Sequence, residues 1–246
     1  MLLKRSIYLT ICLKLELPIL LKYSFILSDL LVPIHLSLSE KNTKHFKQKT
    51  YEETMTQRKS EHKINPLILN RWSPRSMSGE EISDSELMSL FEAARWAPSS
   101  YNSQPWRFIY AKRNTEDWDN LFNLMDDFNK SWAKNAAVLM VVISRKNFEH
   151  NEKPSRTHSF TAGSAWQNLA LEASSRNLVA HGMQGFDYDK ARKDLDIPND
   201  YEVEAMIAVG KKGKIEDLPE NLQKMESPSE RKPLKDIIMV GKFRKE

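Results

Sequence analysis

The uncharged run Ala136–Ser144, AAVLMVVIS, constrains the fold of this chain more than any other segment. A continuous apolar run of this length is typical of a strand that is buried on both faces, because a half-exposed strand would alternate polar and apolar residues. Such a strand belongs to a sheet with other elements packed on each side. We therefore expect one sheet at the centre of the fold.

Helical patterns are present on both sides of this run in the sequence. Asn65–Pro66 predicts the opening of a short helix that extends to Arg71. Ser83 and Glu86 fit a capping box for a helix that ends before Pro98. Residues 157–180 are predicted to form the central core helix, because apolar side chains recur there at three- and four-residue spacing. These side chains are Ala162, Ala165, Trp166, Leu169, Ala170 and Ala173.

The remaining segments predict further strands and short helices. Trp106–Ala111 and Glu202–Val209 read as strands. A helical stretch is expected around residues 118–125 and another over residues 188–195, with a turn at Gly182 and Gly185 before the second. Helices that alternate with a few apolar strands predict an α+β fold, or α/β sandwich, with one sheet.

The first 54 residues form a separate problem. Apolar stretches in residues 1–39 are broken by Lys14, Glu16, Lys22 and Asp29, and none reaches the roughly 18 residues needed to span a bilayer. A signal or anchor remains open, and residues 39–58 read as a polar linker. Translation could also begin at Met55. We therefore treat residues 1–54 as an N-terminal extension and residues 55–246 as the folded domain.

Composition and missing motifs exclude several classes of protein. The single Cys12 excludes a disulfide framework and a cysteine-rich metal site, and it fits a reducing cytoplasm. The six histidines include no pair at the i, i+4 spacing of a helical zinc site, so no metal is expected. Dinucleotide-fold, P-loop, serine-hydrolase and zinc-protease motifs are all missing from the sequence. A net charge of +4 does not identify a nucleic-acid protein.

Two polar segments are candidates for binding. In Arg71-x-Ser73-x-Arg75, alternate side chains of an extended chain share one face, so both guanidinium groups and the hydroxyl can meet one anion such as phosphate. In the loop of residues 99–106, Asn102 and Gln104 offer amide donors and acceptors that suit a flavin. The alternatives are a solvated basic turn and an ordinary hydrophilic loop.

Together, the order and spacing of these segments resemble the nitroreductase family of FMN enzymes over residues 65–241. The most specific parts are the Arg-x-Ser-x-Arg entry and the run AARWAPSSYNSQPWRF of residues 93–108. Weaker matches are AWQNL at 165–169, HGMQGFD at 181–187 and SERKPL at 229–234. The resemblance implies the nitroreductase-like fold, a dimer with a mostly antiparallel central sheet flanked by helices.

The resemblance also implies the residues that hold FMN. These are Arg71, Trp72, Ser73, Pro74, Arg75, Asn102, Gln104, Met183, Gln184, Gly185, Ser229 and Arg231. Gln184 and Gly185 would lie near the flavin N5, and no side chain would act as catalyst because the chemistry belongs to FMN. Many members have an acidic residue at the position of Gln184, so this departure leaves the substrate or nucleotide preference open.

The implied activity is a ping-pong transfer from NADPH or NADH through FMN to a nitroaromatic, a quinone or an enone. The resemblance further implies a cytoplasmic homodimer with FMN at its interface, where Asn102 reaches the flavin of the other subunit and residues 233–243 extend toward the neighbour. Neither a membrane nor a nucleic-acid partner is expected. Two alternatives stay open: a non-catalytic protein that binds flavin or another anion, and a tethered nucleic-acid protein.

Overall fold

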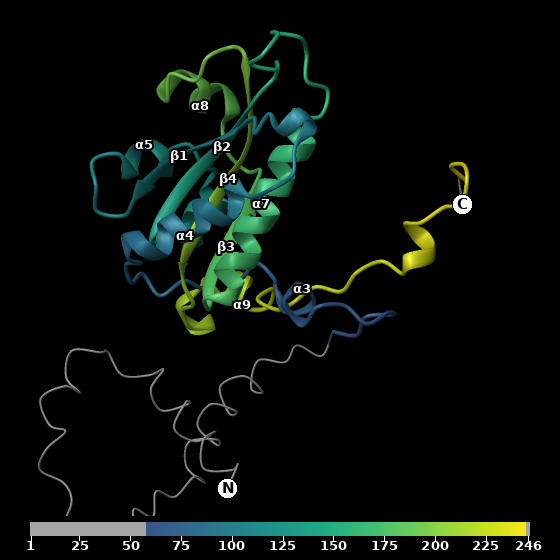
Figure 1. Ribbon diagram of the computed structural model, residues 1–246. Helices are drawn as coiled ribbons and strands as arrows, with labels where there is room; N and C mark the ends of the chain where they lie inside the picture. Colours follow the sequence, from purple (N-terminus) through teal and green to yellow (C-terminus); the bar gives the residue numbers. More distant parts are fainter. Residues whose placement is uncertain (1–57, 245–246) are drawn as a thin grey trace, which may run out of the picture. The chain divides into compact units, whose positions relative to one another are not determined.

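The computed structural model describes residues 58–244. Within these residues, strands β1 (Trp106–Lys112), β2 (Val138–Arg145), β3 (Leu178–Met183) and β4 (Tyr201–Lys211) form one sheet. The strand order is β1-β2-β4-β3, and every neighbouring pair is antiparallel. Helices lie on both sides of the sheet (Figure 1). The predicted α+β class is confirmed, whereas the predictions for residues 1–54 lie outside the described residues.

Strand β2 is the apolar run, and the prediction that both of its faces are buried is confirmed. Residues 138–144 are all buried. Their side chains alternate between two hydrophobic cores: Leu139, Val141 and Ile143 belong to one, and Val138, Met140 and Val142 belong to the other. The period of two in a strand therefore places one uninterrupted apolar segment between two helical layers.

Helices α4 (Asp84–Arg95) and α7 (His158–Ser175) cover one face of the sheet. The predicted capping box is confirmed, since Ser83 Oγ accepts from the Glu86 N–H and the Glu86 carboxylate accepts from the Ser83 N–H. Asn168 Nδ2 donates to Ala93 O at 3.1 Å and ties α7 to α4. The short helix α3 (Pro66–Asn70) contacts α7, and Asn65 caps it as predicted.

The opposite face carries shorter helices. They are α5 (Trp118–Phe122), α6 (Asp127–Ala133), α8 (Tyr188–Asp194) and α9 (Glu220–Gln223). The 3-10 turns are η2 (Ser100–Asn102), η3 (Ile215–Asp217) and η4 (Leu234–Asp236). Helix α6 was not expected from its sequence. Asp126 begins it by accepting from the Asn129 N–H at 2.7 Å.

The prediction of one helix over residues 157–180 is wrong at its end. Helix α7 stops at Ser175, and Asn177 has a φ of 59°, a left-handed conformation that commonly terminates helices. Residues 178–183 then form β3 and pair with β4. The apolar residues at 178–180 continue the pattern of the helix, and a short apolar run does not reveal whether it is helix or strand.

The predicted turn at Gly182 is also wrong, because this residue lies inside β3 and pairs with Ile207. A Cβ built on Gly182 would meet the Trp166 ring at 3.2 Å. The glycine therefore allows the indole of α7 to pack closely against the strand, which is a common reason for glycine in a strand.

Candidate functional site

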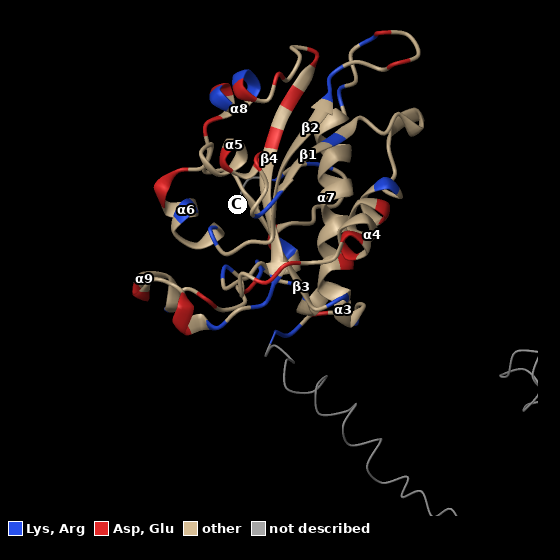
Figure 2. Cartoon of the chain, turned by 90° about the vertical axis from the view of Figure 1, so that its left-hand side faces the viewer, with Lys and Arg blue, Asp and Glu red and all other residues tan. Residues whose placement is uncertain are grey.

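Four arginine side chains among the described residues line one cavity of about 240 Å³. They are Arg58, Arg71, Arg75 and Arg231. The other lining residues are Trp72, Ser73, His181, Met225, Ser227 and Ser229. Figure 2 shows several blue, basic positions in the region between α9 and α3, around the end of β3. Segments that are more than 150 residues apart in sequence thus build one basic cavity, and they include both Arg-x-Ser-x-Arg and the SERKPL segment.

The end of α3 places the first segment in the cavity wall. Arg71 caps the helix with ψ of 126°, so the chain becomes extended immediately after α3. Arg71 Nη1 donates to Ser73 Oγ at 3.2 Å, which shows that these two predicted side chains face each other. Met77 forms a bridge to Lys212, and this contact fixes the segment beside the end of β4.

Several guanidinium N–H groups in this cavity have no acceptor. The Nε and Nη2 atoms of Arg58 and the Nε atom of Arg75 are buried without a hydrogen-bond partner in residues 58–244. Arg58 uses only Nη1, which donates to Leu69 O and Arg71 O at 3.1 Å. A buried charged donor without an acceptor is costly. The cavity therefore favours an anion with several oxygens.

The charges of the arginines also indicate that the cavity favours an anion. Burial lowers the pKa of Arg71, and the positive charges of Arg231 and Arg58 lower it further. Burial and the charge of Arg231 also lower the pKa of Arg58, while Glu230 partly opposes them. The guanidinium groups remain protonated because their ordinary pKa is so high. Their mutual repulsion would be relieved by a phosphate, whose oxygens match the arginine fork.

Sequence reasoning missed Arg58 because it lies outside the motif, in a stretch that reads as a polar linker. The sequence also gives His181 no role beyond its place in the HGMQGFD match. His181 lies on β3, its Nδ1 is 3.0 Å from Pro74 O, and its ring centroid is 4.7 Å from that of Trp132. Burial is the largest cause that lowers the pKa of His181, so a neutral imidazole supports the arginine segment.

Strand β3 leads from this cavity to the predicted residues Met183, Gln184 and Gly185. Met183 is buried and Gln184 is exposed. Gly185 O accepts hydrogen bonds from the Asp126 N–H at 3.1 Å and from Asn129 Nδ2 at 3.0 Å. The start of α6 therefore fixes the turn that follows β3.

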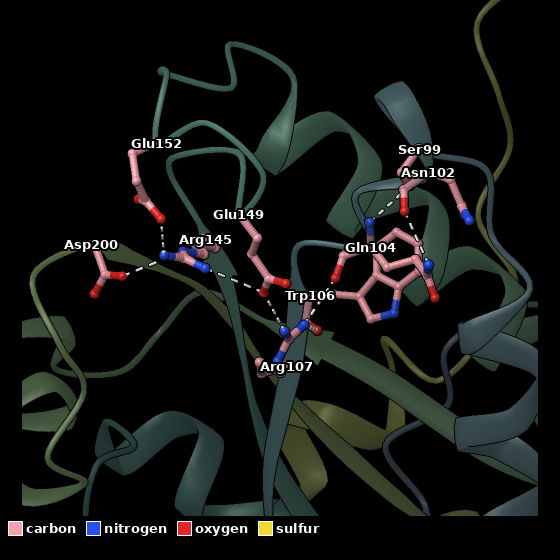
Figure 3. Close-up of polar contacts among 9 residues, drawn as sticks. All are labelled: Ser99, Asn102, Gln104, Trp106, Arg107, Arg145, Glu149, Glu152 and Asp200. Carbon is pink, nitrogen blue, oxygen red and sulfur yellow. Dashed lines mark hydrogen bonds and ion pairs between the residues drawn. The ribbon is translucent and has the colours of Figure 1, made fainter.

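The loop with Asn102 and Gln104 has an unusual backbone. Tyr101, Asn102 and Gln104 have φ values of 53°, 53° and 46°, and non-glycine residues rarely adopt this region. Figure 3 shows the contacts that hold the loop: the Gln104 N–H donates to Ser99 Oγ and Gln104 Nε2 donates to Asn102 O, both at 3.0 Å. Strained backbone of this kind clusters at functional sites.

Within one chain, this loop does not meet the arginine cavity. Trp106 follows the loop and pairs with Ser144 at one end of the sheet. The arginine segment lies at the other end, where Met77 bridges Lys212 (Figure 1). The structure therefore brings Arg71, Ser73, Arg75, Ser229 and Arg231 together and leaves Asn102 and Gln104 apart from them.

A second polar cluster occurs beside a bulge in β4. The pairing of β2 with β4 shifts at Val142, so Glu204 has no partner in the register. Its carboxylate accepts hydrogen bonds from Ser144 and Ser159, and Ser144 Oγ lies 2.7 Å from His158 Nδ1. Ser144 is fully buried, so this serine cannot act as a nucleophile toward a substrate. In the part of the chain that the structure describes, no group of His, Cys, Asp or Glu is arranged to hold a metal.

Comparison with known proteins extends these observations. A solved oxidoreductase containing FMN is 44% identical, covers 77% of this chain and 97% of its own, and superposes with a TM-score of 0.74. The oxygen-insensitive NADPH nitroreductase of Helicobacter pylori strain J99 is 41% identical over 91 residues, which are 36% of this chain and 42% of that protein. Protein DrgA of Synechocystis is 29% identical over 180 residues, 62% of this chain and 83% of DrgA.

The matches to the Helicobacter nitroreductases span less than half the length of those relatives. The model of the nitroreductase family, in contrast, matches residues 68–211, which is more than half of the chain. These residues include the loop at 99–104 and all four strands of the sheet. The resemblance noted in the sequence is thereby confirmed, and the chain belongs to the nitroreductase family.

Proposed function

We propose that this protein is an FMN-dependent oxidoreductase that passes reducing equivalents from NADPH or NADH to a small acceptor. The acceptor class is a nitroaromatic, a quinone or an enone, and reductant and acceptor use the site in turn. One observation carries the proposal: four arginines converge on a cavity in which the Nε groups of Arg58 and Arg75 are buried without acceptors. A flavin phosphate supplies the missing oxygens.

In this proposal, the cavity residues hold the phosphate and the ribityl chain. Arg71, Arg75 and Arg231 bind phosphate oxygens, Ser73 and Ser229 add hydroxyl groups, and Trp72 and Pro74 shape the wall. The backbone of Met183, Gln184 and Gly185 borders the flavin ring at the end of β3. Arg58 also binds the phosphate in this proposal, because its buried Nε and Nη2 groups lack acceptors that phosphate oxygens would supply.

FMN, when bound, supplies the redox chemistry by accepting electrons from the nicotinamide nucleotide and giving them to the acceptor. The chain itself needs no nucleophile. Its charged arginines keep a positive potential at the site, which favours binding of anionic groups. The neutral His181 and the buried Pro74 hold the arginine segment in place without adding charge.

We also propose that the site is completed by a second copy of the chain. Asn102 and Gln104 lie at the opposite end of the sheet from the cavity, so a flavin contact from them requires a neighbouring subunit. Trp96, Tyr101 and Phe160 are 73%, 85% and 78% exposed, and such apolar surface favours association. Ile238, Val240 and Phe243 of the tail are also exposed and could pack on the partner.

The cellular location and the partners of the protein also belong to the proposal. No helix in residues 58–244 has both the length and the apolar character that a bilayer crossing requires. The proposal places the protein in the cytoplasm, with a small molecule as its redox partner and without a nucleic-acid partner.

The test uses purified protein loaded with FMN. Stoichiometric yellow protein should be bleached by NADPH or NADH without oxygen and should regain its colour when the acceptor is added. Arg71→Ala combined with Arg75→Ala should lose FMN. The control is Arg176→Ala, since Arg176 pairs with Glu172 on α7 and lies outside the cavity.

Two results would count against the proposal. If the double variant keeps stoichiometric FMN, these arginines do not bind the phosphate. If the yellow protein is bleached by neither nucleotide, the chain is a flavin-binding protein without this activity. An analytical ultracentrifugation run on the same sample tests the dimer, which a monomer mass would exclude.

A further inference from the structure

Glu226 is a buried carboxylate that no motif in the sequence identifies. It is only 7% exposed, and it stands between Met225 and Ser227, which both line the arginine cavity. Its Oε1 atom accepts three hydrogen bonds, from the N–H of Arg75, the N–H of Ser76 and the hydroxyl of Ser76, each at 2.8 Å. Its Oε2 atom is buried without a partner in residues 58–244.

These contacts connect the two halves of the basic cavity. Arg71 and Arg75 come from the segment after α3, whereas Ser227, Ser229 and Arg231 come from the segment after α9. Glu226 belongs to the second segment and binds the backbone of the first. Ser76 also accepts from the Gly213 N–H at 3.0 Å, so the joint is anchored to the end of β4.

We propose that Glu226 is the positioning residue of the anion site, and that it orients Arg75 and the segment carrying Arg231 toward one phosphate. This inference rests on the proposed function, because it assigns a role within the FMN site. Hydrogen bonds from N–H groups to a carboxylate are stronger than those to a neutral amide. A carboxylate that bridges two successive N–H groups fixes the orientation of the chain at Arg75.

Two possible roles of Glu226, as a negative charge and as a positioning residue, predict opposite changes in FMN affinity when it is removed. As a charge, Glu226 opposes the binding of an anion, so its removal should strengthen FMN binding. As a positioning residue, it prepares the arginines, so its removal should weaken FMN binding. Glu230 offers a matched control, because it is an exposed carboxylate on the same segment whose charge acts on Arg58.

The experiment measures the dissociation constants of FMN and riboflavin by flavin fluorescence for the wild type, Glu226→Gln and Glu230→Gln. We expect Glu226→Gln to weaken FMN binding about tenfold, because three charge-assisted hydrogen bonds become neutral or are lost. Riboflavin binding should change less than twofold because riboflavin has no phosphate. Glu230→Gln should leave FMN binding equal or tighter. Unchanged or tighter FMN binding in Glu226→Gln overturns the inference, and so does an equal loss for both flavins.

A second variant decides the question if Glu226→Gln does not fold. Ser76→Ala removes one of the three hydrogen bonds and keeps every charge, so it should weaken FMN about threefold and spare riboflavin. No selective loss in Ser76→Ala overturns the inference. A wild-type protein that binds no FMN contradicts the proposed function itself, whereas a wild type that binds FMN beside unaffected variants contradicts only the role of Glu226.

Discussion

Gly185 lies so close to Asp126 that no side chain fits between them: a Cβ on residue 185 would be 2.2 Å from Asp126 Oδ2. Asp126 caps α6, and Asn129 of the same helix donates to Gly185 O. The turn after β3 and the first turn of α6 are therefore one packed unit. Glycine at this position is required by the protein's own packing, before any ligand is considered.

Gly185→Ala should consequently damage both stability and flavin binding. The added methyl group must displace Asp126 and Asn129, which costs about 1–3 kcal/mol by analogy with other overpacked sites. Urea unfolding of the FMN-free protein measures the first effect and flavin fluorescence the second. The control is Gly163→Ala in α7, where a Cβ meets nothing within 4 Å and alanine should stabilise the helix by about 0.5–1 kcal/mol. Equal behaviour of the two variants would contradict the packing argument.

His181 should make the protein less stable in mild acid. Burial lowers its pKa below the ordinary 6.5, so the unfolded chain binds a proton more readily than the folded chain. Stability from this group is complete above pH 6.5, and it falls by up to about 1.4 kcal/mol per pH unit below that pH until the lowered pKa is reached. Urea midpoints between pH 8 and pH 5.5 should show this slope.

The slope should be smaller in His181→Gln, which cannot titrate in this range. His150→Gln is the matched control because His150 is exposed. A wild-type slope that persists unchanged in His181→Gln would assign the acid sensitivity to other groups.

Arg58 should contribute to FMN affinity although it lies outside the family motif. Arg58→Ala removes a guanidinium group from the cavity wall, and two of its nitrogens are buried without an acceptor among the described residues. We expect FMN binding to weaken about tenfold, the usual range for a charged hydrogen bond. Lys59→Ala removes a neighbouring exposed charge and should change the dissociation constant less than twofold. An equal loss of FMN affinity in both variants would show that any nearby positive charge has this effect, and that Arg58 does not bind the phosphate directly.

Mixed dimers test whether Arg71 and Asn102 serve the same flavin from different subunits. In a dimer of one Arg71→Ala chain and one Asn102→Ala chain, one site then keeps both residues and the other loses both. Such a heterodimer, purified with two different tags, should bind one FMN per dimer at wild-type affinity. If both residues acted within one subunit, each site would carry one substitution and no wild-type site would remain.

Much of the fold could be predicted because its signals are local. The capping box at Ser83, the Asn65 cap and the apolar run of β2 each specify their element within a few residues. Strand β3 could not be predicted, because Leu178, Val179 and Ala180 continue the apolar pattern of α7 and only the backbone of Asn177 separates the two elements. The boundary between α7 and β3 depends on the pairing of residues 178–183 with β4, which the local sequence does not show.

The residues of the candidate site also fall into two groups, those that a local motif predicts and those that act through distant contacts. Arg71, Ser73 and Arg75 form a short pattern that the sequence shows directly. Arg58, His181 and Glu226 contribute through contacts with residues that are distant in sequence, and each has an ordinary local context. The hydrogen bond from the Ser76 N–H to Glu226, for example, joins residues 150 positions apart.

This last separation determines the order in which the protein can be assembled during its synthesis. All strands of the sheet precede Gly213, so a growing chain can complete its sheet while residues 225–231 are still attached to the ribosome or not yet made. The two segments with arginines can join only after that. The remaining loop is then short, because the Gly213 N–H already holds Ser76 beside the end of β4, and only residues 213–226 separate this contact from Glu226. On the proposed function, FMN binding therefore follows the assembly of the sheet. We expect a chain that ends before residue 226, and so lacks Glu226 and Arg231, to bind FMN more weakly than the full chain.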